Sequence, residues 1–156
     1  MLLTPKQQDR LEQLAVKLQT ADAPTSDLVA ELVSEACPRM ALLNKSVTAA
    51  LQFERLTKTS AWTDLAIALI GLELPAWKLR RLVYEDGAWF CSLSQRTEMP
   101  VELDDTADAR HESLPLAIFS AFIEARRRST ACATEPQTVP QIRPSQGYAI
   151  CCDNFA

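Results

Sequence analysis

The chain has 156 residues, of which 47% are hydrophobic and 23% charged, and its formal net charge is −4. These values are ordinary for one globular domain, and the negative charge disfavours binding to nucleic acid or to an anionic membrane. Only three glycines and one histidine occur, which excludes glycine-rich phosphate loops, dinucleotide fingerprints and metal sites that need two histidines.

The sequence also indicates the cellular compartment of the protein. Its first residues lack the basic and then apolar segments of a secretory signal. The apolar runs at 65–72 and 114–123 are shorter than the roughly 20 residues that span a bilayer. Five cysteines form an odd set without the spacing of a disulfide framework. We therefore expect a reduced, cytoplasmic protein, and we expect it to need no cofactor.

Apolar residues recur at helical spacing through the first half of the chain. They predict four helices, at about 5–19, 26–36, 39–57 and 62–71. Thr4 before Pro5 is typical of a helix start, and Thr25 or Ser26 is expected to cap the second helix. The fourth segment is apolar almost all round, which indicates that it is buried.

A β-hairpin is predicted at about 77–94, around Asp86-Gly87. This dipeptide favours a type I′ turn, in which both central residues adopt positive φ. A two-residue turn sets three cross-strand pairs: Tyr84 with Trp89, Leu82 with Cys91, and Arg80 with Leu93. A helix over 75–84 is the alternative, because the two consecutive arginines interrupt the alternation of a strand.

The predicted register gives the hairpin two different faces. One face is apolar and should pack against helices, since an isolated hairpin is not stable; it carries Leu82, Tyr84, Trp89, Cys91 and Leu93. Cys91 is then expected to be a small core residue rather than a nucleophile. The opposite face should remain available to a partner, and it carries Arg81, Val83, Phe90 and Ser92.

The last third of the chain predicts a connection, a core helix and a tail. Residues 95–112 are polar and indicate a connection, with a third strand at 99–103 as an option. Ser113 precedes a strongly apolar helix at about 114–128. Three prolines among polar residues then predict a flexible or partly ordered tail at 129–156. The fold class is therefore α+β, mostly helical, with four to five helices and one domain at 1–128.

Two segments carry a resemblance to known proteins: WKLRRLVYEDGAWFCSLS at 77–94 and LDDTADARHESLPLAIFSAFIEARR at 103–127. They are similar to a set of small bacterial proteins that have no assigned activity. The resemblance implies a bacterial cytoplasmic protein, and it assigns no function to any residue.

An acidic run before the core helix is the first candidate for chemistry. Asp104, Asp105, Asp108 and His111 could hold a divalent cation or act as acid and base. On a helical turn Asp108 and His111 would share one face. The simpler interpretation is that acidic residues precede the helix because its dipole favours negative charge there. The weak catalytic candidates are therefore His111 and Asp108.

A basic set at the start of the hairpin is the second candidate. Lys78, Arg80 and Arg81 lie near aromatic residues, as in surfaces that stack single-stranded nucleic acid. The leading hypothesis is nevertheless a non-catalytic interaction or regulatory module that binds a protein partner or itself. Large aromatic residues that could form an interface support it, and no recognisable catalytic set competes with it.

Overall fold

The computed structural model of the chain describes residues 5–42, 47–100 and 104–131. Along these residues lie six helices and three strands. The helices are α1 (Pro5–Thr20), α2 (Ser26–Ala36), α3 (Pro38–Leu42), α4 (Val47–Lys58), α5 (Trp62–Glu73) and α6 (Leu114–Ala131). The strands are β1 (Lys78–Glu85), β2 (Ala88–Ser94) and β3 (Ala107–His111). The predicted α+β class, mostly helical with a C-terminal core helix, is confirmed.

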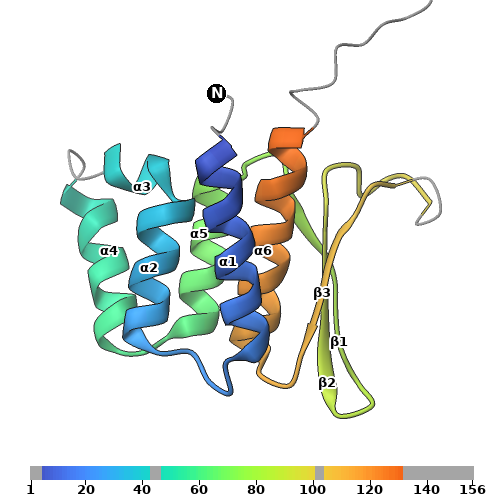
Figure 1. The fold of residues 1–156 in the computed structure, drawn as a ribbon, viewed down its shortest axis with the longest axis horizontal. Coiled ribbons are helices and arrows are strands. Elements are labelled where there is room, and N and C mark those ends of the chain that lie inside the picture. Colours follow the sequence, from blue (N-terminus) through green and yellow to red (C-terminus); the bar gives the residue numbers. More distant parts are fainter. Residues whose placement is uncertain (1–4, 43–46, 101–103, 132–156) are drawn as a thin grey trace, which may run out of the picture.

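The three strands form one antiparallel sheet in the order β1-β2-β3. Within the described residues, all helices lie on one side of this sheet (Figure 1). Helix α6 packs against β2 and β3, and α1 and α5 pack against α6 from the other side. Helix α6 is therefore enclosed, and most of its residues from Leu116 to Ala125 are fully buried. No helix of the described ranges is long and apolar enough to cross a membrane.

The predicted caps and turns of the helical half are partly confirmed. The Thr25 side chain accepts a hydrogen bond from the Leu28 backbone N–H at 3.3 Å, so Thr25 is the N-cap of α2. The single helix predicted at 39–57 is wrong, because α3 and α4 are separate helices. A tertiary contact holds α3: the buried carboxylate of Glu73 accepts from the Met40 N–H at 2.7 Å.

The hairpin follows its predicted turn but not its whole register. Asp86 and Gly87 have φ of 53° and 79°, as a type I′ turn requires. The pairs Tyr84–Trp89 and Leu82–Cys91 are confirmed. The predicted pair Arg80–Leu93 is wrong, because Leu79 lies opposite Leu93 and a β-bulge leaves Arg80 without a cross-strand partner. The alternative helix at 75–84 is excluded by β1.

The connection predicted at 95–112 contains a strand, β3, which pairs with β2 from Leu93–Ala107 to Trp89–His111. The third strand therefore lies after the predicted position of 99–103, of which 101–103 fall outside the described residues. The small apolar residues Ala107 and Ala109 lie opposite Leu93 and Cys91, on the side of the sheet that faces α6.

The exposure of Tyr84 and the end of α6 differ from the prediction. Tyr84 is 59% exposed although it was expected in the core, because α6 covers β2 and β3 and leaves the end of β1 uncovered. Helix α6 continues to Ala131, and the indole Nε1 of Trp77 donates to Ser129 Oγ at 2.8 Å. Residues 129–131 therefore belong to the fold, and the rest of the predicted tail lies outside the described residues.

Candidate functional site

The side of the sheet that faces away from the helices brings together residues from all three strands. Pairing aligns them in two rows across the sheet, Arg81–Ser92–Asp108 and Val83–Phe90–Arg110. Side chains alternate between the two faces of a sheet, and Leu93, Cys91 and Ala107 face the helices and are fully buried. The two rows therefore share the opposite side, which we call the open face.

The centre of the open face is apolar and is flanked by a cation. Val83 and Phe90 lie opposite each other and are half-buried. The guanidinium carbon of Arg81 lies 5.7 Å from the centroid of the Phe90 ring, within range of a cation–π interaction. Arg81 Nη2 also lies 3.0 Å from Glu85 Oε1 in an exposed ion pair. Ser92, predicted as part of the accessible surface, is only 4% exposed.

Strand β3 adds charge to the open face at its other edge. Asp108 is exposed, and its Oδ2 accepts from Thr106 Oγ1 at 3.0 Å. Arg110 donates to the carbonyl of Glu85 at 3.2 Å and lies 3.5 Å from the carboxylate of Asp86. The sequence analysis read this segment as a polar connection, in which Asp108 and His111 would share a face only on a helical turn, and it did not single out Arg110. The signal was present, because ADARH alternates small apolar and charged residues as a strand does.

The four residues of the predicted acidic site do not meet. Asp104 pairs with Arg80 and accepts from Ser94 Oγ at 2.5 Å, and Asp105 pairs with Arg128. Asp108 and His111 share a strand rather than a helical turn, and their odd spacing places them on opposite faces. Within the described ranges, no three His, Cys, Asp or Glu residues are grouped to hold a metal ion.

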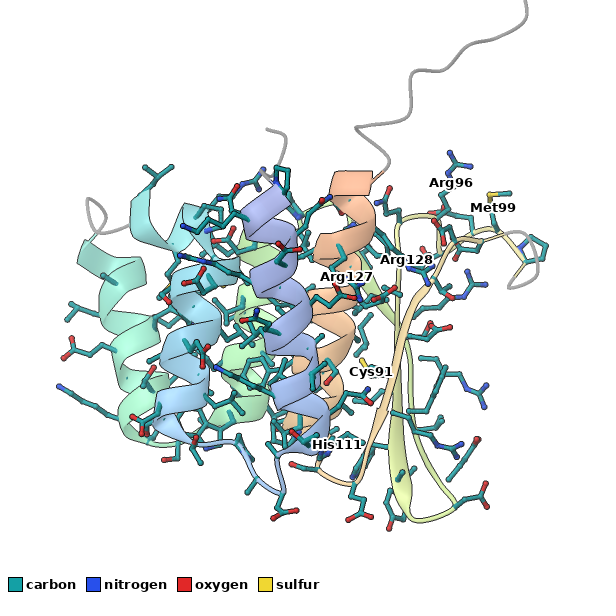
Figure 2. All side chains as sticks on the ribbon, viewed as in Figure 1. Cys91, Arg96, Met99, His111, Arg127 and Arg128 are labelled. Carbon is teal, nitrogen blue, oxygen red and sulfur yellow. The ribbon has the colours of Figure 1, made fainter. Side chains whose placement is uncertain are left out.

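His111 lies at the end of β3 and lines an open depression of about 440 Å³. Its Nδ1 accepts from the Ser113 backbone N–H at 2.9 Å, so of the two ring nitrogens only Nε2 is not committed to this hydrogen bond. Figure 2 shows His111 at the opposite end of the molecule from Arg96 and Met99. The depression also contains Gln19, Thr20, Ala21, Asp22, Ala88, Arg110 and Glu112. Asp108, the predicted partner of His111, is not among its lining residues.

The residues of the predicted basic set, like those of the acidic site, do not lie together on one surface. Arg80 is 16% exposed at its side chain and is held by Asp104 and by the carbonyl of Met99. Lys78 and Arg81 are exposed, but only Arg81 lies in the rows of the open face. Arg80 is therefore occupied within the fold and cannot turn to a phosphate without breaking a buried ion pair.

The described cysteines are buried. Cys91 is fully buried between the sheet and the helices (Figure 2), and burial, together with the charge of Asp108, raises its pKa to about 12. Burial and the charge of Glu73 likewise raise the pKa of Cys37, and the charge of Arg126 partly opposes this shift. Both thiols stay protonated near neutral pH, so neither is an activated nucleophile. Cys132, Cys151 and Cys152 lie outside the described residues.

Comparisons of the chain with protein-family models, with curated proteins and with solved structures found no match.

Proposed function

We propose that this chain is a small cytoplasmic interaction module that binds a protein partner through the open face of its sheet. One observation carries the proposal: Val83 and Phe90 lie at the centre of a sheet face that no described helix covers. An antiparallel sheet commonly packs one face on the core and leaves the other to solvent, where polar residues then predominate. An aromatic residue at the centre of that face departs from this pattern.

The surroundings of Phe90 favour a protein as the partner. Protein interfaces combine an apolar centre with a polar rim, and they are enriched in aromatic residues and arginine. Here Phe90 and Val83 provide the centre, while Arg81, Arg110 and Asp108 provide the rim. The rim carries both signs of charge and its arginines contact Glu85 and Asp86. Such a balanced surface suits another protein better than a polyanion.

The two other hypotheses receive less support from the geometry. An acid/base or metal-assisted enzyme needs Asp104, Asp105, Asp108 and His111 in one site, and they lie in separate environments. Nucleic-acid binding needs Lys78, Arg80 and Arg81 on one surface, and Arg80 is engaged with Asp104.

The test compares the proteins that co-purify with the full chain and with two variants. Phe90→Ser removes the aromatic centre, and Ile67→Ser removes an apolar side chain that is 49% exposed on α5, away from the sheet. Truncating a central aromatic residue commonly costs about 2 kcal/mol or more of binding free energy, roughly a thirtyfold loss of affinity.

We expect the wild type and Ile67→Ser to retain at least one protein. An untagged copy of this chain counts as such a protein. The same protein should be lost with Phe90→Ser. If every retained protein is retained equally by all three baits, the open face is not the binding surface.

A further inference from the structure

We infer that the occupant of the open face is a second copy of this chain, bound face to face about a two-fold axis parallel to β2. This inference rests on the proposed function and names its partner. The observation behind it is the order of charges across the sheet. In the row Arg81–Ser92–Asp108, a cation lies on one edge strand, a carboxylate lies on the other, and a small hydroxyl side chain separates them.

A two-fold axis parallel to the central strand superposes opposite edges. When two identical sheets face each other about such an axis, β1 of one copy lies over β3 of the other, and β2 lies over β2. Arg81 then meets Asp108 of the second copy, and Asp108 meets Arg81 of the second copy. Both contacts join unlike charges, and Ser92 between them, which is small and only 4% exposed, does not hold the two sheets apart. The row is therefore complementary to itself, as an isologous interface requires.

The second row fits the same axis. Phe90 lies on the central strand, so it meets Phe90 of the second copy close to the axis. Aromatic pairs in offset or tilted arrangements add to binding beyond the area that they bury. Val83 meets the aliphatic part of Arg110 of the second copy, and arginine stems pack well on apolar surface. A two-fold axis perpendicular to the strands instead keeps each edge strand over the same strand of the second copy. Midway between the rows it places Phe90 against Ser92, and through the Phe90 row it places Arg110 against Arg110, so the parallel axis is favoured.

The size of the face limits the strength of the dimer. Packed sheets lie about 10 Å apart and cross at about 30° because each is twisted. A face of three short strands with two aligned rows is a small contact surface, which is typical of weak or transient interfaces. We therefore expect a dimer with a dissociation constant on the order of 100 µM, which forms when the protein is concentrated or held locally.

Charge reversal tests this arrangement by sedimentation equilibrium from about 10 µM to 1 mM. Arg81→Asp places two pairs of carboxylates opposite each other in a homodimer, and Asp108→Arg places two pairs of arginines opposite each other. Like charges across an interface cost several kcal/mol, so each variant alone should dimerise at least about tenfold more weakly than the wild type. The control Asp9→Arg makes the same charge change as Asp108→Arg at an exposed position of α1 and should dimerise as the wild type does.

The decisive sample is an equimolar mixture of the two variants. In each heterodimer, the carboxylate introduced at position 81 of one copy faces the guanidinium introduced at position 108 of the other. The second contact joins the unchanged Asp108 of the first copy to the unchanged Arg81 of the second, so both contacts again join unlike charges. We expect the mixture to dimerise about as well as the wild type, and this recovery also shows that both variants are folded. If either variant fails to fold, Phe90→Ser replaces it and should sediment as a monomer at every concentration.

Three results would overturn the inference: a wild type that stays monomeric at 1 mM, single variants that dimerise as the wild type does, or a mixture that stays monomeric although both variants are folded. None of them removes the proposed function, which fails only if binding of other proteins is also independent of Phe90. A heterologous partner that is lost with Phe90→Ser, together with a monomeric wild type, would keep the proposed function and discard the second copy.

Discussion

At the scale of single residues, Arg80 and Asp104 show how the sheet is joined to the connection before β3. The bulge turns Arg80 out of the cross-strand ladder, and its guanidinium contacts Asp104 and the carbonyl of Met99. Ser94 Oγ donates to the same carboxylate and accepts from the Arg96 N–H at 2.9 Å. The bulge and the ion pair therefore form one unit, which fixes where the chain leaves β2.

This unit predicts different effects at two adjacent aspartates. The Asp104 side chain is 2% exposed, so Asp104→Ala leaves a largely buried guanidinium without its partner. Breaking a buried pair costs about 3 kcal/mol of unfolding free energy. The Asp105 side chain is 83% exposed beside Arg128, so Asp105→Ala should change stability by less than about 1 kcal/mol. Urea unfolding of both variants measures the difference, and equal losses would contradict this role of Asp104.

Among the secondary-structure elements, the glycines of the turn and of α5 differ in the backbone conformation that they adopt. Gly87 has φ of +79° in the turn of the hairpin, and no atom lies within 4 Å of an added Cβ. Gly71 lies inside α5, again with no atom within 4 Å of an added Cβ. Only the backbone conformation distinguishes the two positions, because neither substitution would create a clash.

Alanine at each glycine should therefore change stability in opposite directions. Gly87→Ala forces a side chain into the left-handed region and should destabilise the protein by about 1 kcal/mol. Gly71→Ala replaces a poor helix former and should stabilise it by up to about 1 kcal/mol. Thermal unfolding of the two variants gives the signs. A neutral Gly87→Ala would mean that the turn does not need positive φ.

The hairpin and β3 differ in how much of each could be predicted from the sequence. The turn dipeptide fixes its own conformation and the register next to it, so Tyr84–Trp89 and Leu82–Cys91 were predictable from local residues. The register beyond Arg81 was not, because the bulged Arg80 is held by Asp104, a residue 24 positions away. Strand β3 was missed because five residues with two alanines carry a weak apolar alternation inside a polar segment.

The candidate site was predictable only where it depends on the local register of the hairpin. Arg81, Val83 and Phe90 follow from the hairpin register and lie on the open face as expected. Asp108 and Arg110 required the pairing of β3 with β2, which is a contact between distant segments. The burial of Ser92 was also beyond the local sequence, because the exposure of a residue on the central strand depends on the assembled sheet around it.

At the scale of the whole molecule, the fold divides its sheet into a structural face and a free face. The inward side is buried against α6, and α1 and α5 pack against that helix in turn. The outward side carries an aromatic centre and charges of both signs that no described helix covers. We propose that this outward side is the surface on which the protein binds its partner.

The most direct measurement of this claim places a benzophenone-bearing amino acid at single positions of the full chain and irradiates the cells that express it. Position 90 lies on the open face, whereas position 84 lies on the same hairpin and the opposite face, and its natural tyrosine is 59% exposed. We predict a cross-linked protein adduct from position 90 and little or none from position 84. Equal adducts from both positions, or an adduct from position 84 alone, would contradict binding through the open face.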